Sequence, residues 1–138
     1  MTLRTFFTRA ISSLALCTTF ATANAQTEFD SHQIATSCAI SLQLARIAIT
    51  QGVLGDINQP RASISYIKYS ELLRKHRATL EQPSPNGLSF TQYWHTVNSM
   101  VDRKTERLPG GKIVLKKSLG TPEQFYKDES QFIDLRCE

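Results

Sequence analysis

The sequence contains little of several residue types, and each shortage excludes a class of protein. Its 138 residues include only six glycines, five prolines and one tryptophan, and no block repeats at a fixed period. Collagen-like, solenoid and low-complexity architectures are therefore excluded. With 41% hydrophobic and 20% charged residues, the composition is that of one globular domain.

The chain also lacks the short motifs of well-known catalytic and metal sites. It contains no Gly-x-Ser-x-Gly elbow, no His-Glu-x-x-His and no Cys-x-x-Cys, so the common serine hydrolase, zinc protease and thiol oxidoreductase signatures are missing. None of its histidines, His32, His76 and His95, has a second ligand-type residue three or four positions later. We therefore expect no metal site, no cofactor and no enzymatic activity. No motif in the chain identifies a protein family.

The first 25 residues have the composition of a secretory signal peptide. Arg4 and Arg9 form a basic start, residues 10–23 carry no charge, and Ala23-Asn24-Ala25 fits a small-x-small cleavage site. The uncharged run is too short and too rich in serine and threonine to span a membrane. We predict cleavage after Ala25 and a periplasmic or secreted mature protein.

Cleavage leaves a mature chain of residues 26–138 with two cysteines, Cys38 and Cys137, because Cys17 belongs to the signal peptide. An exported chain with two cysteines is expected to form one disulfide. The bridge would close a loop of about 100 residues, which the chain-entropy description values at roughly 4–5 kcal/mol. The alternative is a pair of free buried thiols.

The mature chain is only weakly basic. Cleavage removes two of the sixteen positive charges and leaves the twelve negative ones, a net charge of +2. So small a charge argues against nucleic-acid binding, as do the predicted export and the lack of a basic helix carrying stacking aromatics. The charges are nevertheless uneven, because residues 61–117 are basic while the segments on either side are acidic.

Four segments have helical periodicity with recognisable ends, and we predict helices over about residues 30–54, 60–81, 89–108 and 121–137. Ser89 and Gln92 form a capping box at the third start. Thr121 followed by Pro122 fits an N-cap and a first helical position at the fourth. Because short loops favour antiparallel neighbours, we predict a mainly α protein, a small up-and-down four-helix bundle forming a single domain.

The first predicted helix differs from the others because apolar or small residues surround it on nearly all sides. A helix without a polar face belongs at the centre of a bundle. Cys38 faces inward on it, as Cys137 does on the fourth helix. We therefore predict that the disulfide joins the first helix to the fourth.

The connection between the third and fourth helices is long for a bundle, at residues 108–120. Its segment 112–117 has the pattern of an extended arm or of one strand of a small hairpin. Six basic residues gather where the third helix meets this connection, and we call them the basic cluster: Arg103, Lys104, Arg107, Lys112, Lys116 and Lys117. They form the candidate partner-binding surface, with a merely solvated surface as the alternative.

Arg46 is the only charged residue between Asp30 and Asp56, in the most apolar segment of the chain. A buried guanidinium without a partner costs several kcal/mol. We expect a buried ion pair with Asp128 or Glu129. The alternatives are that the long side chain reaches the surface, or that it binds an anionic ligand.

Small exported helical proteins with a disulfide include immunity proteins against cell-wall-degrading toxins, enzyme inhibitors and envelope chaperones, an analogy of architecture alone. We therefore expect a non-catalytic protein-binding module, of the inhibitor or immunity type, that acts on an envelope enzyme. Its partner would be another envelope or secreted protein.

Two alternatives stay open. The basic cluster could bind anionic lipid or polysaccharide of the envelope, or His95 and Asp102 could belong to an unfamiliar small enzyme. Exposure of Ile113, Val114 and Leu115 inside the basic segment would favour a protein partner over a hydrophilic polymer.

Overall fold

The computed structural model describes residues 31–138. The predicted signal peptide, residues 1–25, and its cleavage site lie outside the described residues. The described chain is mainly helical. Its elements are a helix over residues 31–50, here called the central helix, followed by α2 (Pro60–Glu81), α3 (Phe90–Lys104), β1 (Thr105–Arg107), β2 (Ile113–Leu115), a short 3-10 helix (Lys117–Leu119) and α4 (Pro122–Arg136).

The predicted helix starts are confirmed where the structure describes them. The Ser89 hydroxyl accepts a hydrogen bond from the Gln92 amide, and the Gln92 side chain accepts one from the Ser89 amide. Thr121 caps α4 by accepting from the Gln124 amide, with Pro122 in the first turn. These contacts satisfy amide groups that the first turn of a helix leaves unpaired.

Two predicted helix ends are wrong, each for a local reason. The central helix stops at residue 50 rather than 54, because Gly52 has φ 95°, a left-handed conformation that no helix can continue through. The third helix stops at Lys104 rather than near Leu108. From Thr105 on, the chain forms β1, which pairs antiparallel with β2. The residues predicted as the last turn of the helix therefore belong to the hairpin.

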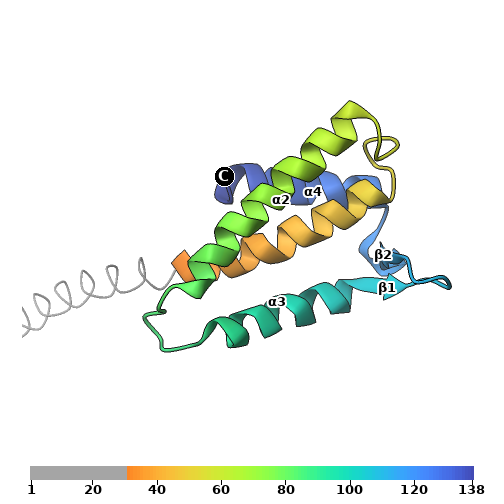
Figure 1. The fold of residues 1–138 in the computed structure, drawn as a ribbon. Helices are drawn as coiled ribbons and strands as arrows, with labels where there is room; N and C mark the ends of the chain where they lie inside the picture. The colour runs from red at the N-terminus through yellow and green to blue at the C-terminus, as the bar shows by residue number, and fades with distance from the viewer. Residues whose placement is uncertain (1–30) are drawn as a thin grey trace, which may run out of the picture.

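The central helix supplies residues to all three hydrophobic clusters of the described chain. Leu42 packs with residues of α2 and α4, Leu44 packs with residues of α3 and β2, and Ala35 packs with residues from both α2 and α3. In Figure 1 the central helix, coloured orange to yellow, runs between α2 and α3 with α4 behind it. Its predicted central position is confirmed.

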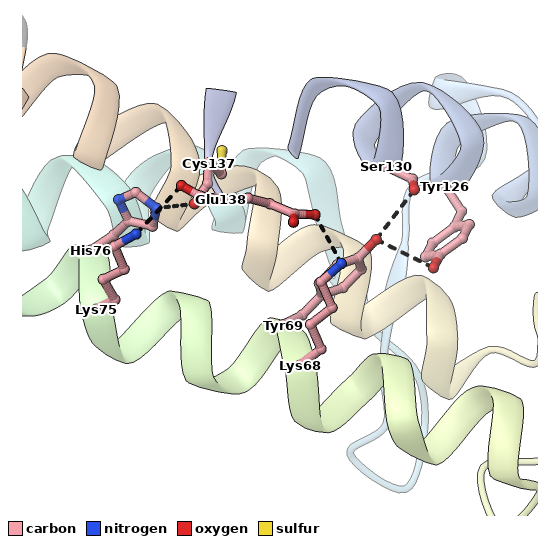
Figure 2. Close-up of polar contacts among 8 residues, drawn as sticks. All are labelled: Lys68, Tyr69, Lys75, His76, Tyr126, Ser130, Cys137 and Glu138. Atoms are coloured by element: carbon pink, nitrogen blue, oxygen red, sulfur yellow. Dashed lines mark hydrogen bonds and ion pairs between the residues drawn. The ribbon is translucent and has the colours of Figure 1, made fainter. Parts of the chain in front are cut away.

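The disulfide forms as predicted and joins the central helix to the end of α4. Cys38 and Cys137 are fully buried, and their Cα atoms lie 5.6 Å apart across a sequence separation of 99. Buried His76 of α2 fastens the same end, since its Nε2 lies 2.7 Å from the Cys137 carbonyl oxygen (Figure 2). Three helices therefore meet at this bridge.

Further polar contacts hold α4 against α2 (Figure 2). The Lys68 ammonium donates to the Glu138 carboxylate at 2.8 Å, and the Tyr69 hydroxyl lies 3.2 Å from the Ser130 hydroxyl. The hydrogen bond from Lys68 lowers the pKa of the Glu138 carboxyl below its usual value. This ion pair is exposed, so it orients the chain end more than it stabilises the fold.

Within residues 31–138, no helix combines the length and the apolarity needed to cross a bilayer.

Removing the disulfide should cost much of the protein's stability. The double substitution Cys38→Ala/Cys137→Ala frees a loop of about 100 residues in the unfolded chain, and we expect a loss of about 4–5 kcal/mol. Urea unfolding followed by circular dichroism measures it. Wild-type protein treated with a dithiol reductant should show a comparable loss, and a cost below about 1 kcal/mol in both samples would contradict the prediction.

Candidate functional site

The basic cluster occupies the end of α3 and both sides of the hairpin. Arg103 and Lys104 form the last turn of α3, Arg107 ends β1, Lys112 directly precedes β2, and Lys116 and Lys117 follow it. The hairpin thus brings residues from opposite ends of the segment 103–117 to one place. The two-stranded hairpin, rather than an unstructured arm, is the form that the structure takes.

The hairpin is held by backbone and side-chain hydrogen bonds on both sides. The Leu108 amide donates to the Lys112 carbonyl at 2.7 Å, and Gly110 and Gly111 take left-handed φ values of 94° and 93° in the turn. The Arg107 guanidinium donates to the Gly111 carbonyl at 2.9 Å. Only residues that tolerate positive φ fit this turn, which explains the consecutive glycines.

A side chain of the central helix region anchors the hairpin to the helical scaffold. The Leu115 amide donates to the Gln51 side-chain oxygen at 2.9 Å, and the Lys116 amide donates to the Lys104 carbonyl at 3.0 Å. Leu115 itself is buried in the cluster that contains Leu44 and Val97. The base of the hairpin is therefore part of the core, and only its turn end projects.

The apolar residues of the hairpin divide into a buried and an exposed group. Val114 and Leu115 are buried, whereas Ile113 is 40% exposed and Leu108, across the turn, is 39% exposed. The register pairs Ile113 with Arg107. The surface near the turn therefore combines two exposed aliphatic side chains with the cations of Arg107 and Lys112.

The cations of the basic cluster make no ion pair within residues 31–138, where the salt bridge formed is Lys68–Glu138. Arg103, Arg107, Lys112 and Lys117 are exposed, while Lys104 and Lys116 are half-buried. Burial raises the pKa of the Glu129 carboxyl, and the nearby charge of Lys104 partly opposes this rise. The four exposed cations are the ones free to meet a partner.

Arg46 does not form the expected ion pair with Asp128 or Glu129. Its Nη2 donates to the Tyr66 hydroxyl at 2.8 Å, and its guanidinium carbon lies 4.6 Å from the centre of the Tyr66 ring. Glu129 instead lies near Ser41, whose side chain partly opposes the rise that burial causes in the pKa of the Glu129 carboxyl. Ser41 and Arg46 are five residues apart and so lie about 140° apart around the helix axis. The Glu129 carboxylate, near Ser41, therefore lies on a different side of the central helix from Arg46.

The other predicted partner of Arg46, Asp128, lies exposed on α4. Its carboxylate accepts a hydrogen bond at 3.0 Å from the side-chain amide of Gln124, four residues earlier. This is a local contact within one helix. Asp128 therefore belongs to the outer surface of α4 rather than to a buried pair.

The histidines fall into two kinds of surroundings. His32 and His76 are buried and bonded to backbone carbonyls, while His95 is exposed on α3. No hydrogen bond joins His95 to Asp102 in the described chain. His76 lies within 4.8 Å of the Cys38 and Cys137 sulfur atoms, but the disulfide between these sulfurs leaves no thiolate that could bind a metal.

Sequence analysis missed two residues that complete these sites. Tyr66 lies in the second predicted helix, and Arg46 and Tyr66 lie at similar distances from the connection between the central helix and α2. In an antiparallel pair such positions face each other, so the short connection contained the signal. Leu108 was assigned to the third helix, and only the Pro109-Gly110-Gly111 turn that follows it signalled a hairpin.

The burial of Glu129 should make stability depend on pH. Burial raises the pKa of its carboxyl above the ordinary value of 4.5, against the opposing effects of Ser41 and Lys104. The folded protein then binds this proton more tightly than the unfolded chain, so stability from this group is lost as pH rises through its folded pKa. We expect Glu129→Gln to be more stable than wild type at neutral pH, with the difference vanishing below about pH 4.5.

Chemical denaturation over a series of pH values measures this difference, and Asp128→Asn controls for the removal of one negative charge from α4. A Glu129→Gln protein that is less stable than wild type at neutral pH would show that Ser41 and Lys104 compensate the buried carboxylate.

Comparison with known proteins identifies no relative: no family model, no curated protein and no solved structure matches this chain.

Proposed function

We propose that this protein is an exported, non-catalytic protein-binding module on an up-and-down four-helix bundle, and that it recognises its partner through the turn end of the hairpin. Successive helices run in opposite directions in Figure 1, which favours the bundle. The disulfide favours an oxidising compartment, as does the signal-like composition of residues 1–25. The proposed activity is inhibition of, or immunity to, an envelope enzyme.

One observation carries the proposal: Leu108 and Ile113 are 39% and 40% exposed beside the unpaired cations of Arg107 and Lys112. Protein interfaces combine a small apolar centre with a polar rim, and arginine is enriched in them. A surface for anionic lipid or polysaccharide needs the charges but gains little from exposed aliphatic side chains. The combination of exposed aliphatic side chains with cations favours a protein partner.

The construction of the hairpin supports the same conclusion. Its turn is fixed by the Leu108–Lys112 and Arg107–Gly111 hydrogen bonds, and its base is fixed by the Gln51 side chain. A binding loop that is already ordered loses less conformational entropy when the complex forms. The burial of Val114 and Leu115 makes the hairpin more rigid. It also means that Ile113 is the one residue of the segment 113–115 that is exposed and able to contact a partner.

The charge of the surface indicates the chemistry of the partner. Four exposed cations, Arg103, Arg107, Lys112 and Lys117, lie in the segment 103–117 that contains Leu108 and Ile113. Glu106 is the acidic residue among them. Because strand side chains alternate, Arg107 and its partner Ile113 lie on one face of the hairpin, and Glu106 lies on the other face, toward which Leu108 also alternates. An acidic surface on the partner would speed association and fix its orientation.

The enzyme alternative has less support. His95 and Asp102 are both exposed on α3 and are not bonded to each other. General acid–base catalysis needs such groups within hydrogen-bond reach of each other or of a reacting atom. They fit the solvated outer face of the helix.

The test compares three variants of the oxidised protein as baits for an extract of its own cell envelope. The apolar variant is Leu108→Ser/Ile113→Thr, and the charge variant is Arg103→Gln/Lys112→Gln/Lys117→Gln. The matched control removes three exposed cations from elsewhere, Arg61→Gln/Arg74→Gln/Lys127→Gln. Bound material is eluted with rising salt and identified by mass spectrometry.

We expect wild type and the control to retain one stoichiometric protein at moderate salt, and both hairpin variants to lose at least about 90% of it, which corresponds to roughly 1.4 kcal/mol or more. Material that only the charge variant fails to bind, and that leaves the wild-type bait at the first, low-salt elution steps, would instead identify an envelope lipid or polysaccharide. Equal retention by all variants would exclude the hairpin as the binding surface.

A further inference from the structure

Arg46 has an environment that differs from that of every cation in the basic cluster. It is half-buried against Tyr66, and its Nε–H is fully buried without a hydrogen-bond partner. No carboxylate forms an ion pair with it in residues 31–138. Buried donors are nearly always paired in folded proteins, so an unpaired one on a charged group needs an explanation.

Contact with the Tyr66 ring compensates the charge only in part. A cation over an aromatic face is stabilised by the ring quadrupole, but this attraction is weaker than that of a carboxylate in the same surroundings. The Tyr66 hydroxyl accepts from Nη2 at 2.8 Å, which leaves the hydroxyl proton free to donate elsewhere. The guanidinium and the hydroxyl therefore present donors with no matching acceptor.

Arg46 and Tyr66 line a small cavity together with Gln43, Ile47 and Thr50. Arg46 is the one charged group in this lining, so no neighbouring carboxylate competes for it. The cavity has a volume of about 160 Å³. A cavity of about 150 Å³ is filled by a molecule the size of benzene. This one therefore has room for a single carboxylate or a tetrahedral oxyanion, and not for a nucleotide or a sugar chain.

We propose that this cavity binds one carboxylate or an oxyanion of similar size, with Arg46 as its charged ligand and the Tyr66 hydroxyl as a second donor. The planar guanidinium offers two parallel N–H groups that match the two oxygens of a carboxylate or two oxygens of a phosphate. Gln43 also lines the cavity. The site lies between the central helix and α2 and does not depend on the function proposed for the hairpin.

Sodium acetate and inorganic phosphate, titrated at constant ionic strength, test the proposal on the oxidised protein by two-dimensional ¹H–¹⁵N NMR. Saturable shifts are expected at the amides of Gln43, Arg46 and Thr50 and at the Arg46 Nε–H. Arg46→Met should weaken binding at least about tenfold. Arg46→Lys keeps the charge but loses the paired donors, and Tyr66→Phe loses only the hydroxyl, so both should give intermediate affinities.

The matched control is Arg77→Met. Arg77 also lies over aromatic rings, 5.3 Å from that of Phe90 and 5.1 Å from that of Trp94, but it is exposed and does not line this cavity. Its replacement should leave the titration unchanged. Circular dichroism confirms that each variant is folded, and the thermal midpoint should rise with anion in wild type and Arg77→Met but not in Arg46→Met.

A preference for acetate over phosphate would identify the ligand as a carboxylate, and tighter binding of an N-acetylated, C-amidated glutamate than of acetate would identify its source as an acidic side chain of a polypeptide. A preference for phosphate would identify a free inorganic oxyanion. Shifts that do not saturate, or that are the same in Arg46→Met, would overturn the proposal.

Discussion

Burial of the central helix on two opposite sides is the constraint on which the other elements depend. Leu42 and Leu44, two residues apart, point to nearly opposite sides of the helix and enter different clusters. Each fully buried leucine or isoleucine contributes about 1.5–3 kcal/mol, so neither side can be left to water. α2 and α4 cover one side, and α3 with β2 covers the other. The disulfide at Cys38 then ties the last covering element to the helix.

This arrangement leaves little room for chemistry in the interior. The buried polar residues of the described chain are used by the fold, as when the His76 Nε2–H donates to the Cys137 carbonyl oxygen and the Thr105 hydroxyl donates to the Val101 carbonyl oxygen. Functional groups must therefore be sought where the covering elements end or leave a gap. The hairpin after α3 is such an end, and the cavity between the central helix and α2 is such a gap.

The two cationic sites differ in what they can recognise. At the hairpin several exposed cations act together beside Leu108 and Ile113, which suits a broad surface of opposite charge. At Arg46 a single half-buried cation and one hydroxyl border a small cavity, which suits one anionic group. The first site depends on long-range attraction that salt screens, and the second depends on paired hydrogen bonds in partly desolvated surroundings.

The sequence by itself determined the helical segments, the caps at Ser89 and Thr121, the central helix and the Cys38–Cys137 bridge, because each follows from local chemistry or from hydrophobic periodicity. It also located the basic cluster, whose members are close in the chain. Only the tertiary structure decided that the end of the third predicted helix becomes β1, since that depends on pairing with β2. It also decided that Tyr66 is the partner of Arg46. Arg46 is rotated by about 140° around the helix from Ser41, on the side near Glu129. Periodicity alone does not say which neighbouring element covers each side of a helix.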